Sequence, residues 1–192
     1  MNRLIIATSN TGKVIEIRSA LGEVEGWSLE PLPHDTPEIE ETGETFIENA
    51  VIKAEHYSKY VDALTLADDS GLCVAALGAK PGVHSARYGQ DPPARIARLL
   101  HEMASVDDAA RNAVFYCALA LARSGEVIWT VQGEVAGAIA RSPSGAEGFG
   151  YDPVFRLPAL NRTMAELTTE QKNQLSARGK ALAELRKYLT SH

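Results

Sequence analysis

The segment ADDSGL (67–72) places two adjacent carboxylates and a hydroxyl between two apolar runs. Carboxylate oxygens bind Mg²⁺, and a carboxylate beside a water molecule can accept its proton. Because successive strand residues point to opposite faces, we expect Asp68 and Asp69 to have different roles for as long as the strand continues. One would face a site that binds metal or activates water, and the other would order a neighbouring loop. The alternative is a surface turn, in which Asp, Ser and Gly are common.

The segment TSNTGK (8–13) lies between an apolar run and a predicted helix. Small residues there leave backbone N–H groups exposed at the helix N-terminus, where the helix dipole favours an anion. Lys13 adds a full positive charge. Side-chain donors and acceptors come from Ser9, Asn10 and Thr11. The segment lacks the GxxxxGK[ST] pattern of a Walker A loop, and the alternative is an ordinary capped turn between a strand and a helix.

The acidic segment PEIEETGETFIEN (37–49) could bring a second carboxylate to the same site. In proteins, Mg²⁺ is commonly held by one or two carboxylates, with water and substrate phosphate completing its shell. Glu40 or Glu41 together with Asp69 would therefore suffice. The alternative is a solvated loop whose negative charges complement the dipole of the helix that follows.

The segment GFGYDPVF (148–155) combines aromatic residues with glycines. Phe149 could stack on a flat base, the glycines would let backbone amides approach it, and Asp152 could accept a hydrogen bond from it. The alternative is a glycine-rich loop whose aromatic side chains fill the edge of the core.

Three polar residues of KNQLSAR (172–178) surround a predicted helix start, namely Lys172, Ser176 and Arg178. The planar guanidinium of arginine suits carbonyl and phosphate oxygens. Lysine and arginine on a helix are also common on a solvated surface, which is the alternative for this segment.

Helices interleaved with strands must position these segments, and the pattern predicts an α/β chain with a mixed sheet. Thr45 and Glu48 form a capping box at the start of one helix, and Asp91 followed by two prolines starts another. The run 114–122 is apolar throughout, but its length and the β-rich segment after it favour a strand in a hairpin. The expected strands are 3–8, 63–67, 72–77, 114–122 and 126–140, and the expected helices are 13–21, one after Thr45, one after Asp91, and 174–189.

Composition limits the class of protein. The chain has 192 residues, 45% of them hydrophobic, which is ordinary for one well-buried globular domain. Its net charge of −6 argues against a nucleic-acid polymer as partner, because such a polymer needs a basic surface, but it is compatible with a small nucleotide. No run of about 18 apolar residues indicates a membrane span, so we expect a cytoplasmic protein without a membrane partner. Cys73 and Cys117 lie in apolar runs, and the five histidines show no metal-ligand spacing.

Taken together, five segments resemble the noncanonical purine nucleoside triphosphate pyrophosphatases, the inosine/xanthosine triphosphatase family. They are SNTGK, EETGETFIENA, ADDSGLCVAALGAKPGVHSARY, GFGYDPVF and KNQLSARGKAL, in the family's order and spacing from about residue 3 to 189. The resemblance implies an α/β fold with an elongated mixed β-sheet in two lobes flanked by helices, in a single domain over 1–192. It also implies a homodimer with the active site in the cleft between lobes. The implied reaction is Mg²⁺-dependent hydrolysis of ITP, dITP or XTP to the monophosphate and pyrophosphate, which clears deaminated purines from the nucleotide pool.

The resemblance also implies roles for individual residues. Asp69 is the expected base for the attacking water and, with Glu41, an expected metal ligand, with Glu40 as the second choice. Lys13 is the other expected catalytic residue and neutralises phosphate charge. The expected substrate-binding residues are Thr8, Ser9, Asn10, Thr11, Gly12 and Lys13 on the phosphates, Ser70 on the nucleotide, Phe149, Gly150, Tyr151 and Asp152 on the base and sugar, and Lys172, Ala177 and Arg178 in the base pocket.

One residue departs from the family's pattern. The family usually has S-H-R where this chain has Ser176, Ala177 and Arg178. The side chain of alanine cannot form a hydrogen bond, so we expect weaker discrimination between bases or a higher KM rather than lost chemistry.

Two other functions remain open. One is a pyrophosphatase for another modified nucleotide, and the other is a nucleotide-binding sensor that does not need a competent Asp69.

Overall fold

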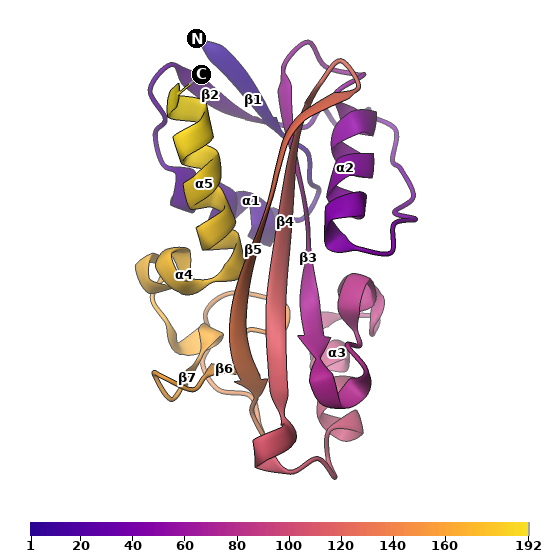
Figure 1. Ribbon diagram of the computed structural model, residues 1–192, viewed down its shortest axis with the longest axis vertical. Coiled ribbons are helices and arrows are strands. Elements are labelled where there is room, and N and C mark those ends of the chain that lie inside the picture. The colour runs from indigo at the N-terminus through magenta and orange to yellow at the C-terminus, as the bar shows by residue number, and fades with distance from the viewer. Residues whose placement is uncertain (192) are drawn as a thin grey trace. The chain divides into compact units, whose positions relative to one another are not determined.

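The structure, a computed structural model, describes residues 1–191 of the chain (Figure 1). Its strands are β1 (Asn2–Ile6), β2 (Trp27–Pro31), β3 (Leu64–Val74), β4 (Asn112–Arg123), β5 (Glu126–Ile139), β6 (Phe155–Leu157) and β7 (Arg162–Thr163). Within the described residues they form one seven-stranded sheet in the order β2-β1-β3-β4-β5-β6-β7. β1 is parallel to β2 and β3, whereas β6 is antiparallel to β5 and β7. The predicted α/β class with a mixed sheet is confirmed.

The described residues form five α-helices, namely α1 (Thr11–Leu21), α2 (Phe46–Tyr57), α3 (Pro92–Glu102), α4 (Thr169–Leu175) and α5 (Ala177–Ser191). Four of these five helices, α1 to α4, follow a residue whose side chain caps them. The capping box of Thr45 and Glu48 is present at α2, and Asp91 accepts a hydrogen bond from the backbone N–H of Ala94 at α3, so both predicted starts are confirmed. No helix in the part of the chain that the structure describes is long and apolar enough to cross a membrane.

The strands β4 and β5 are neighbours in the sheet and form the predicted hairpin. Only Ser124 and Gly125 separate them, and both have positive φ angles, of 53° and 84°. Two-residue hairpin turns of type I′ require this conformation at both positions. The apolar run 114–122 is therefore a strand, as its length predicted.

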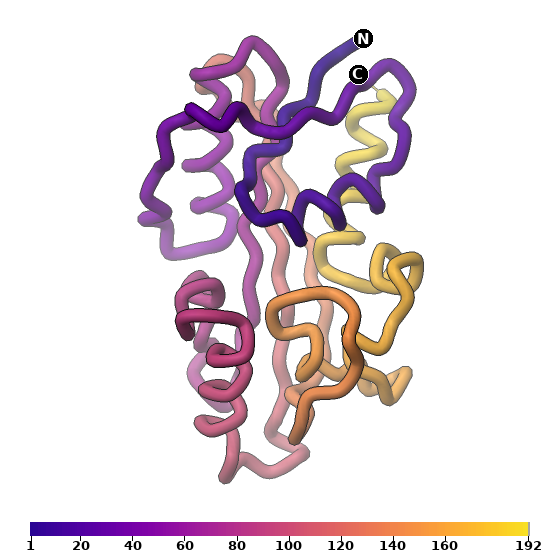
Figure 2. The backbone as a smooth tube through the Cα atoms, turned by 180° about the vertical axis from the view of Figure 1, so that it is seen from behind, coloured from indigo at the N-terminus to yellow at the C-terminus, as the bar shows by residue number. Residues whose placement is uncertain are grey.

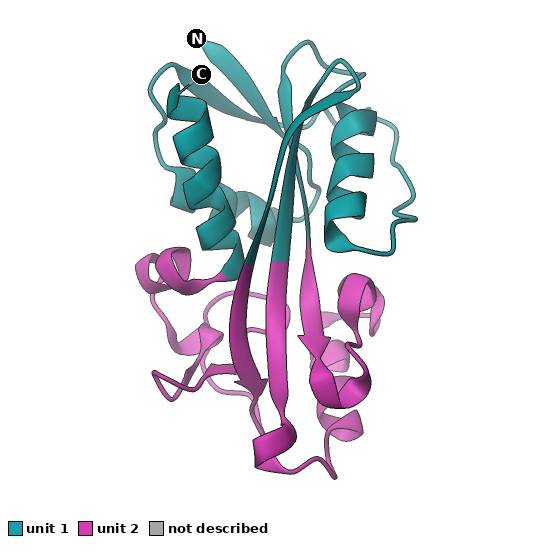
Figure 3. Ribbon diagram, viewed as in Figure 1, with its two compact units in different colours: residues 1–69, 117–133, 177–192 teal, residues 70–116, 134–176 magenta. Residues whose placement is uncertain are grey.

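The chain divides into two compact units (Figure 3). Unit 1 comprises residues 1–69, 117–133 and the residues from 177 on, and unit 2 comprises residues 70–116 and 134–176. The strands β3, β4 and β5 each contribute residues to both units. The single two-lobed domain and the cleft expected between its lobes stay predictions.

Unit 1 has a core of apolar side chains from strands and helices. α1 packs against α5, and α5 ends at the same end of unit 1 at which β1 begins, as both views show (Figures 1 and 2). Burial of such side chains is the main favourable contribution to folding. Almost fully buried residues of this core are Leu4, Ile6, Ile17, Leu21, Leu66 and Leu185.

Unit 2 has its own core, whose fully buried side chains include Leu72, Leu99, Met103, Val154 and Phe155. The buried guanidinium of Arg111 donates hydrogen bonds to the carbonyl oxygens of Met103 and Ile139, both at 2.7 Å. Another of its N–H groups donates to the carbonyl oxygen of Ala140 at 3.1 Å. Because a guanidinium has five donors, one side chain ties the end of α3 to the end of β5, directly before the loop 141–150.

The strand β3 differs from its predicted pattern. The sequence predicts separate strands at 63–67 and 72–77, whereas β3 is continuous across both aspartates and ends at Val74, and residues 75–77 form a short 3-10 turn. The interpretation of ADDSGL as a surface turn is therefore wrong. The strand can continue because each buried carboxylate has cationic partners of its own, which offset the cost of burying its charge.

The predicted C-terminal helix at 174–189 is also different, because two helices, α4 and α5, occupy this part of the chain. They are separated at Ser176, whose ψ angle of 157° is extended rather than helical. Lys172 and Arg178 therefore lie on different helices. Both side chains are buried, so the solvated-surface interpretation of this segment is wrong.

Candidate active site

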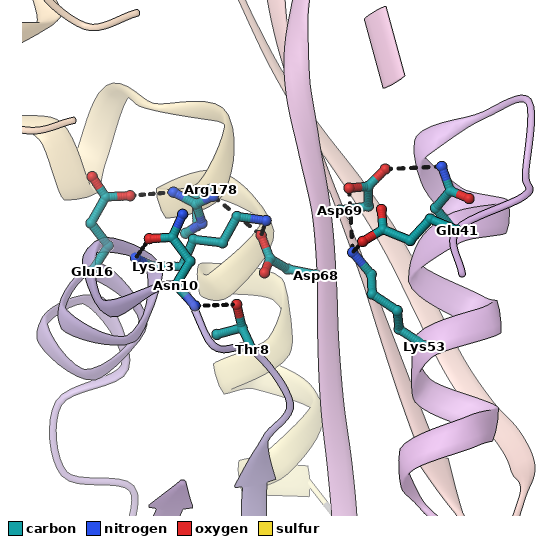
Figure 4. Close-up of polar contacts among 10 residues, drawn as sticks. Thr8, Asn10, Lys13, Glu16, Glu41, Lys53, Asp68, Asp69 and Arg178 are labelled. Atoms are coloured by element: carbon teal, nitrogen blue, oxygen red, sulfur yellow. Dashed lines mark hydrogen bonds and ion pairs between the residues drawn. The ribbon is translucent and has the colours of Figure 1, made fainter. Parts of the chain in front are cut away.

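The two aspartates of β3 lie in unit 1 and face opposite sides of the strand, as expected for neighbours in a strand (Figure 4). Asp68 is 2% exposed and Asp69 is 6% exposed. A buried carboxylate without a cation or a hydrogen-bond donor is very unfavourable. Asp68 accordingly pairs with two cations and Asp69 with one cation and one amide donor, and the two sets of partners come from different parts of the chain.

Asp68 pairs with two cations that are far from each other in the sequence. Its Oδ2 lies 3.0 Å from the Nζ of Lys13 and 3.1 Å from a guanidinium nitrogen of Arg178. Arg178 also pairs with Glu16 of α1. Burial by itself would raise the pKa of Asp68, but Lys13 and Arg178 lower it well below its usual range. Asp68 is therefore ionised and holds both cations in place.

The segment 8–13 forms the turn from β1 into α1. The Oγ1 of Thr8 accepts a hydrogen bond from the N–H of Asn10, and the Oδ1 of Asn10 accepts one from the N–H of Lys13, both at 3.2 Å. Asn10 thus caps α1, as the capped-turn alternative requires. The same turn leaves Ser9 exposed just before the helix N-terminus, and the Lys13 side chain in the first turn of α1 pairs with Asp68 of β3. The phosphate-binding role of this segment stays a prediction.

Asp69 has different partners, which all come from the segments that precede β3. Its Oδ1 lies 3.3 Å from the Nζ of Lys53, and its Oδ2 accepts a hydrogen bond from the amide of Asn49 at 3.3 Å. The Nζ of Lys53 also lies 3.2 Å from the Oε1 of Glu41, so one ammonium group joins two carboxylates (Figure 4). Burial raises the pKa of Asp69. The positive charges of Lys53 and Lys13 oppose this shift, and the negative charge of Glu41 adds to it.

Glu41 is the residue of the acidic segment 37–49 whose carboxylate contacts the ammonium group of Lys53. Its side chain is half-buried against Lys53, whereas Glu40 is exposed. Within residues 1–191 no three His, Cys, Asp or Glu side chains gather into a metal site. Two carboxylates are nevertheless enough for Mg²⁺, which keeps several waters and binds substrate phosphates. The metal-binding role of Glu41 and Asp69 stays a prediction.

In unit 2, residues predicted to bind the base form another buried ion pair. The Oδ2 of Asp152 accepts a hydrogen bond from the N–H of Phe149 at 2.8 Å and lies 2.5 Å from the Nζ of Lys172. That ammonium group lies 5.1 Å from the centroid of the Phe149 ring, within the range of cation–π attraction. Gly148 is necessary for this arrangement, because a Cβ at this position would lie 2.2 Å from the Oδ2 of Asp152.

Tyr151 fills the core of unit 2 instead of facing solvent. Its hydroxyl donates a hydrogen bond to the carbonyl oxygen of Ser85 at 2.9 Å, and the Oγ of Ser85 accepts one from the N–H of Leu72 at 2.9 Å. The core-filling alternative therefore holds for the Tyr151 ring. Phe149 and Gly150, in contrast, are half-buried. Tyr151 thus ties the loop to β3 through its side chain.

Two sets of residues predicted to act together have separate partners. Lys13 and Asp69 are both predicted to act at the phosphates, but Lys13 pairs with Asp68 on the opposite face of β3 from Asp69 (Figure 4). Lys172 and Arg178 are both predicted to line the base pocket, but they pair with different buried acids. The structure therefore assigns each of these four residues a structural partner, and their contacts with substrate stay predictions.

Three other residues that are predicted to bind substrate expose little polar side-chain surface. Ala177 is the first residue of α5 and is buried. Its carbonyl oxygen would lie 2.2 Å from a Cβ at Gly133, so the backbones of α5 and β5 approach closely there. Ser70 and Gly12 are half-buried. Their contacts with substrate stay predictions.

Sequence reasoning missed Asn49, Lys53 and Glu16. Asn49 and Lys53 are four residues apart on the buried face of α2, beside Ala50 and Ala54. Polar residues on the apolar face of a helix are unusual unless they are paired, so their spacing was a usable signal. Glu16 carried no such signal, because its partner Arg178 is 162 residues away in the chain.

Comparison with known proteins identifies relatives along nearly the whole chain. The sequence profile of the Ham1 family matches residues 4–188. The chain is 50% identical over 190 residues to a dITP/XTP pyrophosphatase of Geobacillus kaustophilus, which covers 96% of this chain and 93% of that protein. It is 47% identical over 194 residues to a dITP/XTP pyrophosphatase of Bacillus subtilis, with 98% of each chain covered.

Solved structures of Ham1 proteins have the same fold. A HAM1 protein from Coxiella burnetii matches with a TM-score of 0.90 and 41% identity over 100% of both chains. The Ham1 protein of Staphylococcus aureus matches with a TM-score of 0.87 and 35% identity over 99% of both chains. The resemblance predicted from the five segments is confirmed, and this chain belongs to the Ham1 family.

Proposed function

We propose that this protein hydrolyses deaminated purine nucleoside triphosphates, namely ITP, dITP and XTP, to the monophosphate and pyrophosphate. Two relatives that are 47–50% identical over nearly the whole chain are named dITP/XTP pyrophosphatases, which supports this substrate class. The observation that carries the proposal is the convergence of Glu41, Lys53 and Asp69 from separate segments. This arrangement supplies acids for a cation and an ammonium group beside them, which phosphoryl chemistry needs.

Glu41 and Asp69 would hold Mg²⁺ in this proposal. The residues fit such an ion, because their oxygens lie 3.2 and 3.3 Å from one ammonium nitrogen and so already converge on a cation. Both are hard oxygen ligands, which Mg²⁺ prefers. When bound, Mg²⁺ would neutralise phosphate charge and polarise the phosphoryl group.

The chain's own residues would carry the proton and the charge. Asp69 would accept a proton from the attacking water, whose oxygen forms a bond to the α-phosphorus. The bond from the α-phosphorus to the bridging oxygen breaks, and pyrophosphate leaves with that oxygen. Lys13 and the N–H groups at the start of α1 would stabilise its negative charge.

Phe149 and Lys172 would recognise the base. The ring of Phe149 is half-buried and would stack on the purine, and Lys172 would donate a hydrogen bond to the 6-keto oxygen that deaminated purines share. Adenine would be disfavoured, because its 6-amino group would place a donor against a donor. Discrimination against GTP is expected to be weak, because Ala177 stands where the family usually has histidine.

Release of pyrophosphate from a panel of nucleotides with Mg²⁺ tests the proposal. We expect the highest kcat/KM for ITP, dITP and XTP, lower values for GTP, ATP and modified pyrimidines, and no activity in EDTA. Asp69→Asn is expected to lower kcat by about 10²–10⁴-fold, which is the usual contribution of a general base. A preference for a modified pyrimidine would favour the second pyrophosphatase function. Binding of nucleotide without turnover by the unaltered protein would favour a sensor.

Ala177→His tests the specificity argument. The histidine is expected to raise the ratio of kcat/KM for ITP to that for GTP, because it would return the hydrogen-bonding side chain that the family usually has at this position. An unchanged ratio in a folded variant would contradict this role for position 177.

We also propose a cytoplasmic homodimer as the active form. A cytoplasmic location follows from the substrate, because the nucleotide pool is there. Light scattering after size exclusion should give twice the 20.7 kDa mass of the chain. A mass of one chain at assay concentrations would contradict the dimer and leave the proposed reaction unaffected.

A further inference from the structure

The side chain of Asn49 bridges the acidic loop and the β3 carboxylate. Asn49 lies on α2 and is 2% exposed. Its Oδ1 accepts a hydrogen bond from the backbone N–H of Gly43 at 2.7 Å. Because a backbone N–H can only donate, the amide orientation is fixed, and the Nδ2 must face the Oδ2 of Asp69 at 3.3 Å.

The loop that carries Glu41 is pressed against α2 at this hydrogen bond. Gly43 is two residues beyond Glu41, and a Cβ at Gly43 would lie 2.7 Å from the Oδ1 of Asn49 and 2.7 Å from the Cβ of Glu48. The beginning of the loop is held independently, since the Nε2 of His56 lies 2.7 Å from the carbonyl oxygen of Pro37. Both ends of the acidic loop are therefore tied to the same helix.

The two hydrogen bonds of Asn49 act on the two carboxylates that meet at Lys53. The bond to Asp69 occupies its Oδ2, so that its Oδ1 is the oxygen nearest to the Nζ of Lys53. The bond to Gly43 fixes the loop at the point from which Glu41 reaches the same ammonium group. Loss of the Asn49 amide would release both carboxylates together.

We propose that Asn49 is a positioning residue that sets the geometry of Glu41 and Asp69 toward a divalent cation. This role rests on the proposed metal site, and it adds a residue that acts through one hydrogen bond to a ligand, Asp69, and one to the loop that carries the other ligand, Glu41. Partners of this kind orient ligands, and their loss commonly weakens metal binding by about 10–100-fold.

Binding of Mn²⁺ to the substrate-free protein, followed by electron paramagnetic resonance, measures this role without turnover. Asn49→Leu keeps a side chain of similar size but forms neither hydrogen bond, and we expect its Mn²⁺ affinity to fall by about 10–100-fold. In the activity assay, the Mg²⁺ concentration for half-maximal rate should rise by a similar factor. The rate at saturating Mg²⁺ should largely recover, which a general loss of structure would not allow.

Ala50→Gly is the matched control, because it destabilises α2 at the next residue without altering a polar contact. It should bind Mn²⁺ like the unaltered protein. Gly43→Ala is the second variant in case Asn49→Leu does not fold, and it should weaken binding in the same direction by displacing the loop from Asn49.

Two results would overturn the proposal. One is unchanged Mn²⁺ affinity in a folded Asn49→Leu or Gly43→Ala protein, and the other is an equal loss of affinity in Ala50→Gly. Absence of Mn²⁺ binding by the unaltered protein would instead refute the metal site itself, and the role of Asn49 with it.

Discussion

Asp68 joins distant segments in the interior of unit 1. One of its carboxylate oxygens holds both Lys13 and Arg178, from α1 and from α5. Loss of this negative charge would leave two cations close together in a buried place. Removal of one partner from a buried ion pair is far more costly than the net contribution of the intact pair, because the other charge stays buried without compensation.

Asp68→Asn is therefore expected to lower the free energy of unfolding by about 3–5 kcal/mol. Denaturation by urea, followed by circular dichroism, measures this change. The matched control is Arg141→Ala, which removes an ion pair to Asp108 whose side chains are 55% and 76% exposed. Exposed pairs contribute about 0–1 kcal/mol, so the control should be near neutral. Equal effects of both substitutions would contradict the role of Asp68.

The reactivity of the Cys117 thiol tests the burial of a single side chain in the core. Burial raises the pKa of the Cys117 thiol to about 12, so the thiol stays protonated in the folded protein until the pH approaches that value. Only thiolates react rapidly with disulfide reagents. At pH 8 we expect Cys117 to be unreactive in the folded protein and to react fully in denaturant, as measured by mass spectrometry. Rapid labelling of Cys117 in the folded protein would contradict this burial.

At the scale of elements, the loop before β6 depends on one glycine. Gly148 has a φ angle of +77°, and a Cβ there would lie 2.2 Å from the Oδ2 of Asp152 and 2.7 Å from the Nζ of Lys172. Side chains are strained at such a φ angle, and here there is also a steric conflict with a buried ion pair. The loop can therefore hold Phe149 and Lys172 together only with glycine at this position.

Gly148→Ala is expected to raise KM for dITP by at least about tenfold, since about 1.4 kcal/mol of lost binding corresponds to that factor. Steady-state kinetics measures it. Gly78→Ala is the control, because Gly78 also has a positive φ angle, of 63°, but nothing lies within 4 Å of its Cβ position. The control therefore carries backbone strain without the steric conflict. A KM that does not distinguish the two variants would show that the ion pair does not position the base.

At the scale of the whole molecule, metal binding and folding are linked. A cation that binds only the folded protein stabilises it, by about 2.7 kcal/mol when its concentration is 100 times its dissociation constant. Glu41 and Asp69 come from segments that are adjacent only in the folded chain. The proposed Mg²⁺ site should therefore appear as a stabilisation of the entire protein.

Mg²⁺ is accordingly expected to raise the melting temperature relative to EDTA, as measured by differential scanning calorimetry. Glu41→Gln should abolish this increase, because it removes a ligand. Glu40→Gln is the matched control and should retain the increase, because Glu40 is exposed. An increase that survives Glu41→Gln and is lost in Glu40→Gln would move the metal ligand to the neighbouring residue.

The amino-acid sequence by itself determined the helix caps, the main hairpin and the family. The cap of α3 at Asp91, the capping box at Thr45 and the hairpin turn at Ser124 and Gly125 were predictable, because each depends on residues within four positions of one another. The alternating face of a strand likewise placed Asp68 and Asp69 on opposite sides. The order of the five segments was sufficient to identify the Ham1 family.

Only the tertiary structure decided which charges are paired. Asp68 and Arg178 are 110 residues apart, and nothing in either local sequence indicates that they meet. The continuity of β3 through two carboxylates had the same cause, because a buried charge is tolerated only when distant segments supply its partners. Burial and ion pairing depend on the whole fold, whereas capping and turn formation depend on neighbouring residues, and this difference set the limit of prediction from sequence.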